Sequence, residues 1–359
     1  MSDSALPIPS TGALLPRSTD SSTRSRRRRL IGAHALTWGS GISAVIPLFV
    51  LGAMLVILLV EAMPSIRYNG LSFFTSSQWS TGYQYGTVSH AGGVAHLQGE
   101  HYGAWPLILG TLESSAIALI VGFPIAVGAA VLLVEKLPSK IAAVIGLFLE
   151  VLAGIPSAVI GLWGVFTFGP WLAKNIYPAL THLPNFPPFS IFHGGYGSNG
   201  EGLLAGGLVL AAMIIPIIAA TTRDLLRQVP DATKEGAEAV GMTHFEVFRS
   251  VHARWIRGGV IGAAVLGLGR ALGETIAVAL VMGGVQQVPH NVFSSATTIA
   301  ATLILQLGSA LGDPSGLEVK ALAEAAFVLL LITFVVNVLA RQIVKRAARG
   351  ASLPVGAGF

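Results

Sequence analysis

The sequence has 359 residues, of which 53% are hydrophobic and only 11% are charged, with 22 basic residues against 17 acidic ones. This balance is more apolar and less charged than that of ordinary soluble domains, which excludes that class. Because the sequence has no cysteine, disulfides, thiolate metal sites and thiol redox chemistry are also excluded.

The predicted elements are runs of about twenty or more apolar residues, the length that a helix needs to cross a bilayer core of about 30 Å. All of these runs contain Gly or are flanked by Pro, which packed membrane helices tolerate. The runs cover residues 36–60, 106–134, 141–170, 203–222, 258–283 and 321–340. Series of short alternating strands, the mark of a membrane barrel, are absent from the sequence. The sequence therefore predicts an all-α integral membrane protein with six spans.

The first 35 residues are rich in Ser, Thr and Arg and lack the apolar content to fold, so they are predicted to form a disordered basic tail. The run RSRRRR at 24–29 suits anionic lipid headgroups better than RNA. The apolar run that follows is too long for a cleaved signal peptide, and no small-residue cleavage site stands near Glu61. It is therefore predicted to be a retained first helix.

Basic residues predict the topology, because Lys and Arg favour cytoplasmic loops. Almost all of them lie in the N-terminal tail, the 135–140 turn, the 223–257 loop or the C-terminal tail. The exceptions are Arg67, Lys174 and Lys320 in the opposite loops and Arg270 inside a span. The sequence thus predicts a membrane domain over 36–345 with both termini in the cytoplasm, including a tail at 346–359. The predicted location is the bacterial plasma membrane.

Residues 292–311 are long enough to form a seventh span. A seventh span would place the basic C-terminal tail outside, against the charge rule. The segment also carries Ser, Thr and Gln throughout. We therefore expect it to lie along or dip into the outer face, within an outer segment at 284–320.

The loop after the fourth run predicts a helical hairpin at 231–252. Asp231 is a plausible N-cap for a first helix, and Gly241 is suited to end it. Thr243 and Glu246 have the spacing of a capping box, which starts a second helix at once. Such a hairpin either docks in a groove on a partner or is a solvated connector.

The hairpin carries a family pattern. Glu235, Gly236 and Ala237 followed by Gly241 resemble the EAA loop of ABC importer permeases, the element that docks on the ATPase subunit. The resemblance implies that these four residues couple the chain to an ATPase. This sequence departs from the pattern at His252-Ala253, where the family has a Leu-Pro pair.

A second resemblance covers residues 40–345. GLGRALGETIAVALVMGG at 267–284 is similar to the fifth-span signature of PstC-type permeases of phosphate importers, and YGAWPLILGTL at 102–112 and AGIPSAVIGLWG at 153–164 agree with it. Ile276-Ala277-Val278 favours this type over the sister PstA type. The resemblance implies a type I ABC importer permease for inorganic phosphate. It also implies four kinds of subunit: this chain, a second PstA-like permease, ATPases, and an extracytoplasmic phosphate-binding protein.

Charges inside the membrane point to the same segment. Arg270 lies near the middle of the fifth run, and Glu274 is predicted one turn later on the same helical face. An Arg at the bilayer centre costs about 2.5–3.5 kcal/mol by insertion scales, so such residues are functional candidates. Arg270 would bind the oxygens of phosphate or carboxylate, and Glu274 would hold it when the path is empty. The alternative is an Arg–Glu pair that only locks helices together.

Further polar residues complete the predicted translocation path. Thr275 directly follows Glu274, and Ser157 follows a proline that interrupts the third run and predicts a kink there. Glu113 begins a Ser-rich turn in the second run and would line the outer mouth or pair with Arg270. Glu150 and Glu324 are weaker candidates, with interhelical hydrogen bonding as the default.

Other functions receive less support. The chain has no Walker A sequence, so it is not predicted to be an enzyme, and ATP hydrolysis belongs to a partner. An anion channel or secondary transporter that uses Arg270 and Glu274 is the alternative. A metal importer would gather the outer histidines, but no carboxylate cluster accompanies them. No metal, cofactor or nucleic acid is predicted, and membrane lipid is an expected neighbour.

Overall fold

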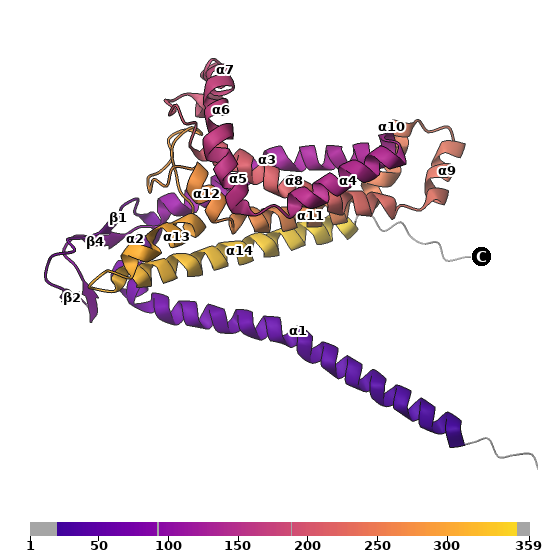
Figure 1. Cartoon of the computed structure of the whole chain (residues 1–359), viewed down its shortest axis with the longest axis horizontal. Coiled ribbons are helices and arrows are strands. Elements are labelled where there is room, and N and C mark those ends of the chain that lie inside the picture. The colour runs from indigo at the N-terminus through magenta and orange to yellow at the C-terminus, as the bar shows by residue number, and fades with distance from the viewer. Residues whose placement is uncertain (1–19, 92, 188, 350–359) are drawn as a thin grey trace, which may run out of the picture. The chain divides into compact units, whose positions relative to one another are not determined.

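The computed structural model describes residues 20–91, 93–187 and 189–349, most of which are helical (Figure 1). The chain divides into two units, one ending at Ile57 and the other beginning at Leu58. The described part of the first unit belongs to helix α1 (Asp20–Asn69), which continues into the second unit. α1 begins inside the tail for which the sequence predicts disorder, in keeping with the high helix propensity of Arg. Residues 1–19 and 350–359 of the predicted tails lie outside the described residues.

Five helices in the described ranges are long and apolar enough to cross a membrane, and a bent pair raises the number to six. This agrees with the predicted number of spans. The apolar stretches are Val45–Asn69, Trp105–Lys136, Leu203–Arg227, His244–Leu272 and Leu317–Arg346. They include the helices α3 (Trp105–Val131), α8 (Leu203–Arg227), α11 (Ala253–Leu272) and α14 (Leu317–Arg349).

The third span is the bent pair. α4 (Ser139–Ala153) and α5 (Ser157–Trp163) meet at an angle of 96°, and the second arm continues through α6 (Gly169–Asn175) and α7 (Tyr177–Thr181). Pro156 has φ −58° and ψ 135°, which is not helical. Proline lacks the N–H group that a helix interior needs. The predicted kink is therefore confirmed.

The core lies between α3 and α8, where small residues let the two helices approach closely. A Cβ added at Gly122 of α3 would lie 3.1 Å from Ile214 of α8, and one at Gly207 of α8 would lie 2.5 Å from Ile117 of α3. α11 packs on α8 in the same way, because Gly267 faces Ile218. The Gly content of the sequence thus serves helix packing.

The fifth span is not one helix, contrary to the prediction. α11 begins at Ala253 and ends at Leu272, and the short helix α12 (Ile276–Val281) follows after a break. Gly273 at the end of α11 has φ −95° and ψ 2°, and the Glu274 N–H bonds the Ala271 carbonyl at 3.4 Å. Glycine loses more conformational freedom in a helix than other residues do, so it favours such an ending.

The outer region contains short strands that the sequence does not predict. β1 (Trp79–Thr81) pairs with β4 (Glu100–Tyr102), and β2 (Ser89–Ala91) pairs with β3 (Val94–His96), both antiparallel. Three-residue strands are too short to show an alternating pattern. The neighbouring elements are α2 (Ser72–Thr75), the 3₁₀ turn Phe189–Phe192 and α13 (Ile299–Ala310). α13 is shorter than a span, in agreement with the expectation for 292–311.

The hairpin α9 (Asp231–Ala239) and α10 (His244–Val247) lies at the end of the long helices opposite to the strands (Figure 1). The capping box between Thr243 and Glu246 is formed on both sides. Gly241 has φ +84°, a conformation suited to glycine, and stands just beyond the end of α9. The N-cap of α9 is Pro230, however, so the predicted capping role of Asp231 is wrong.

Candidate functional site

Two broken spans lie side by side. A Cβ added at Gly161 of α5 would lie 2.8 Å from Ala277 of α12, and one at Gly164 would lie 2.7 Å from the Val281 side chain. From the first contact to the second, the residue numbers increase in both segments, so α5 and α12 run in parallel. Glycine on α5 allows this approach, which a larger side chain would prevent.

The parallel register brings the two breaks to the same depth. The break of the third span precedes Ser157, the first residue of α5, and the break of the fifth span precedes Ile276, the first residue of α12. Counting back from the contact of Gly161 with Ala277 places Ser157 level with residues 273–274. Non-helical backbone inside a membrane occurs where it is buried in protein or lines a path. The paired breaks thus form a candidate translocation site.

Arg270 lies in the last turn of α11, immediately before this break. The residue is half-buried, and its Nε atom is buried without a hydrogen-bond partner. Glu274, also half-buried, forms no ion pair with Arg270 in the part of the chain that the structure describes. The expected shared helical face is wrong, because α11 ends at Leu272 and Glu274 lies beyond its end.

The two hydroxyl residues of the predicted path stand at the breaks. Thr275 caps α12 by position, but its side chain makes no capping hydrogen bond. Ser157 and Thr275 are both half-buried. Neither hydroxyl has a side-chain hydrogen bond to another described residue, in contrast to Thr221 of α8, which donates to the Ile217 carbonyl at 2.9 Å. Their donor capacity is free for a ligand or a partner chain.

Glu113 does not pair with Arg270 among the described residues. It lines a separate pocket of about 280 Å³ between α3 and an outer loop, together with Ile191, Leu203 and His290. Most of the lining is apolar. Glu113 therefore lines this pocket, which includes no residue of the two helix breaks.

The other intramembrane carboxylates have protein partners. Glu150 of α4 accepts a hydrogen bond from Arg223 of α8 at 3.0 Å. Glu324 of α14 accepts one from Ser65 of α1 at 2.6 Å. These contacts agree with the default expectation of interhelical hydrogen bonding. Sequence reasoning assigned Arg223 to the cytoplasmic loop, although its position directly after the apolar run 203–222 allowed the helix to continue through it.

The four predicted coupling residues lie in the hairpin. Glu235, Gly236 and Gly241 are exposed, whereas Ala237 is only 9% exposed and anchors α9. The hairpin also exposes apolar side chains, with Val240 74% and Phe245 70% exposed. Exposed apolar residues on a compact projection are typical of an interaction surface.

Metal ligands do not gather in the described ranges, where no group of three or more His, Asp or Glu residues could hold an ion. The polar residues near the breaks are an arginine, a glutamate and two hydroxyls, which form a donor-rich set. Such a set suits the oxygens of an anion.

Comparison with known proteins identifies relatives over most of the chain. Residues 122–349 match the family described as binding-protein-dependent transport system inner membrane component. The phosphate transport system permease protein PstC 1 of Mycobacterium tuberculosis is 53% identical over 90% of this chain and 96% of its own length. The PstC protein of Haemophilus influenzae is 38% identical over 84% of this chain and 90% of its own.

A solved structure matches the fold. One chain in the crystal structure of a bacterial alginate ABC transporter, in complex with a pentasaccharide-bound periplasmic protein, aligns with a TM-score of 0.52. The alignment covers 90% of this chain and 96% of that one at 14% identity. At this identity the likeness extends to the fold alone, which is that of an ABC importer permease.

Proposed function

This chain belongs to the PstC-type permeases of the binding-protein-dependent transport family, and from that premise we propose that it is a transmembrane subunit of an ABC transporter that imports inorganic phosphate. The chain is not itself an enzyme, and a separate ATPase subunit hydrolyses ATP. The observation that carries the site is the Arg270 guanidinium at the break of the fifth span, with its Nε buried and unpartnered.

Phosphate binds to Arg270 in this proposal. A guanidinium offers a planar fork of donors that matches two phosphate oxygens and stays charged at every physiological pH. A buried donor without a partner is costly, and a passing anion removes this cost for as long as it is bound. Ser157 and Thr275 stand at the breaks and supply neutral donors, which add selectivity for oxyanions without adding charge.

Glu274 limits the affinity. Its carboxylate lies four residues beyond Arg270 across the break, so rotation of the short α12 segment would bring the two charges together. We assign the present arrangement, in which Arg270 and Glu274 are apart, to the state that accepts phosphate. An arrangement in which the two are paired would belong to the state after release. Favourable conduction needs binding strong enough to admit the ion and weak enough to release it.

The hairpin is the proposed contact with the ATPase. Glu235, Gly236 and Gly241 are exposed there, and Phe245 and Val240 present apolar surface beside them. A few buried side chains, often aromatic, carry most of the energy of a protein interface. ATPase closure would move the hairpin and, through α11, the Arg270 site. A second permease and an extracytoplasmic phosphate-binding protein complete the assembly.

We infer the orientation from the basic ends of the helices. The hairpin and the end of α14 with Arg341, Lys345 and Arg346 lie at one end of the bundle (Figure 1). By the positive-inside rule this end faces the cytoplasm. Asn69 at the end of α1 is bonded to the Tyr102 backbone in the outer region. The chain before the first span therefore starts on the cytoplasmic side as well.

The test is uptake of radiolabelled phosphate by cells that carry the complete transporter. We expect Arg270→Gln to lower uptake at least about a hundredfold, because a charge-assisted bidentate contact is lost. Arg254→Gln, at an exposed position of the same helix, is the matched control and should transport normally. Undiminished uptake by Arg270→Gln, with the ATPase still copurifying, would remove Arg270 from the path.

A further inference from the structure

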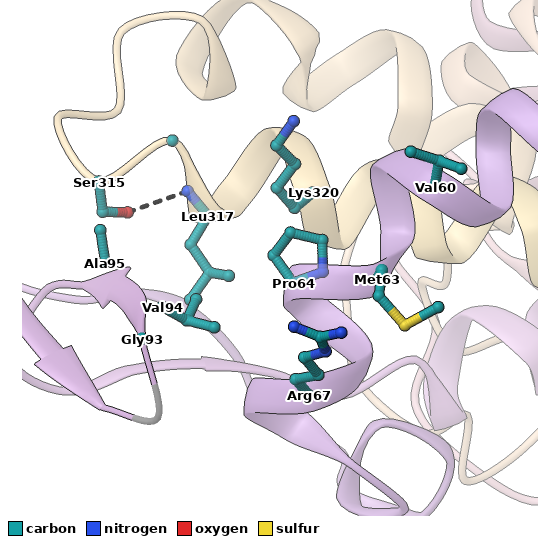
Figure 2. A pocket seen from close by; sticks show the side chains of 11 residues that line it. Val60, Met63, Pro64, Arg67, Gly93, Val94, Ala95, Ser315, Leu317 and Lys320 are labelled. Carbon is teal, nitrogen blue, oxygen red and sulfur yellow. Dashed lines mark hydrogen bonds between the residues drawn. The ribbon is translucent and has the colours of Figure 1, made fainter.

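Two of the three outer basic residues line one pocket. Arg67 and Lys320 border a cavity of about 600 Å³ between the end of α1, residues 93–95 at the start of β3, and the start of α14. Figure 2 shows their side chains on either side of Pro64. The positive-inside rule disfavours basic residues on this side of the membrane. Their presence at a single pocket therefore indicates a local role.

One of the two cations in the pocket lining has no carboxylate partner among the described residues. Lys320 is paired with Glu61. Arg67 is exposed and has neither an ion pair nor a hydrogen bond to any residue in the described ranges. The carboxylates of Glu100 and Asp313 lie beside the lining and accept hydrogen bonds from Ser315, and neither forms an ion pair with Arg67.

Another part of the wall is apolar and exposed. Val60 and Met63 of α1 line the pocket and are 63% and 37% exposed. Both belong to the membrane-crossing stretch Val45–Asn69, in which Arg67 stands in the last turn. Val60 lies two turns from Arg67, which at 1.5 Å per residue is roughly 10 Å towards the membrane interior. The pocket thus joins a cation at headgroup level to an apolar surface at acyl-chain level.

We propose that this pocket binds an anionic phospholipid, with Arg67 on the phosphodiester and an acyl chain along Val60 and Met63. A phosphodiester carries one negative charge, which matches the single cation of the lining that has no ion-pair partner. Inorganic phosphate carries up to two charges and needs donors on all sides, whereas most of this wall cannot donate. The proposal depends on the membrane location of α1 and not on the transported substrate.

Native mass spectrometry of the full chain tests the proposal. The purified chain is equilibrated with equal amounts of phosphatidylglycerol and phosphatidylcholine, and the bound lipid is measured. We expect Arg67→Gln to lower phosphatidylglycerol retention about fivefold, the effect of one basic side chain near an anionic lipid surface. Arg67→Lys should retain it. Lys174→Gln, the third outer basic residue and exposed outside the pocket, should leave it unchanged.

A second pair of measurements separates lipid from free phosphate. Met63→Gln places a polar group at acyl-chain level and should weaken phosphatidylglycerol retention while Arg67 is intact. Millimolar inorganic phosphate should not displace the lipid. Equal retention by Arg67→Gln and the parent chain, or an equal loss in Lys174→Gln, would overturn the proposal. Full displacement by phosphate with no effect of Met63→Gln would assign the pocket to the free ion instead.

Discussion

The Nδ1 atom of His252 lies 3.1 Å from the carboxylate oxygen Oε1 of Glu135. His252 ends the π-helical turn Phe248–His252, which directly follows α10. Glu135 belongs to the π-helical turn Leu132–Lys136, which directly follows α3. The imidazole is 2% exposed, and its ring packs edge-on against Phe248. Neither ring nitrogen has a hydrogen bond to a described residue, because the close approach to Glu135 is poorly aligned. The base of the hairpin is thus held against the end of α3 mainly by packing.

We predict that His252→Leu is tolerated. Leucine is the residue that the EAA-loop pattern has at this position, and it fills the buried space without two unpartnered nitrogens. Replacing an unsatisfied buried polar group by an apolar one is neutral or stabilising, here by up to about 1 kcal/mol. The midpoint of thermal unfolding of the purified chain should stay equal or rise.

His252→Ala is the contrasting variant. It removes the same nitrogens but leaves a cavity, so its unfolding midpoint should fall. A clear loss of stability in His252→Leu as well would mean that the contact with Glu135 stabilises the fold more than its geometry indicates.

A second prediction concerns Gly146 of α4. A Cβ at this position would lie 2.4 Å from Nη1 of Arg223, whose guanidinium also bonds Glu150. Gly146→Ala should displace the flexible guanidinium and break this contact between α4 and α8. We expect a loss of about 1 kcal/mol, the value of a partly exposed ion pair, in chemical unfolding of the purified chain.

The double variant Gly146→Ala/Glu150→Gln shows whether the ion pair is the cause. If it is, the alanine costs much less stability once Glu150 has lost its charge. An undiminished cost in the double variant would point to a clash with the helix backbone instead.

The spans could be predicted from the sequence because the bilayer imposes a minimum length of apolar helix. Local sequence was equally informative where one or two residues determine the backbone conformation. Pro156 predicted the kink, and Thr243 with Glu246 predicted the start of a helix. Gly273 gave a weaker signal, since glycine is also common inside packed membrane helices. The sequence therefore predicted one continuous fifth span where the chain has two helices.

The site was only partly predictable. The apolar surroundings make a charged Arg270 costly to insert and so identify it as a functional candidate. The assumption of a continuous helix, however, wrongly placed Glu274 on the same helical face as Arg270. The contacts of Arg223 with Glu150 and of Glu324 with Ser65 join residues far apart in the sequence. No local pattern encodes such pairs, because they depend on how whole helices pack.

A third prediction uses two glycines of α3. A Cβ at Gly110 would lie 2.1 Å from the backbone oxygen of Thr297, whereas one at Gly128 would meet no atom within 4 Å. Backbone cannot move aside as a side chain can, so Gly110→Ala should lower stability by about 1–3 kcal/mol. Gly128→Ala should be neutral or stabilising by up to about 1 kcal/mol. Thermal unfolding of both variants in the same detergent gives the comparison, and similar midpoints would contradict the close contact.

A fourth prediction concerns the hairpin surface. Phe245→Asp should abolish copurification of the ATPase with the tagged chain, because a charge replaces an apolar group that is 70% exposed in the isolated chain. The unfolding midpoint of the chain alone should not change. Phe245→Leu retains apolar contact and should keep most of the ATPase. Full recovery of the ATPase with Phe245→Asp would move the interface away from this face of the hairpin.

The last prediction addresses the hydroxyls at the helix breaks. Thr275→Val keeps the shape of the side chain and removes the donor that the proposal assigns to phosphate. A hydrogen bond to a charged group contributes about 1.5 kcal/mol, so the KM for phosphate uptake should rise about tenfold with little change in the amount of transporter in the membrane. Ser157→Ala should act in the same direction.

Thr221→Val is the matched control, because its hydroxyl is already bonded to the Ile217 carbonyl within α8. It should leave the KM unchanged. If all three variants raised the KM equally, the effect would come from general loosening of the bundle. If only Thr275→Val and Ser157→Ala raised the KM, phosphate would pass at the broken helices. The register of α5 and α12 places Ser157 level with the end of α11, so both hydroxyls could contact the same ion.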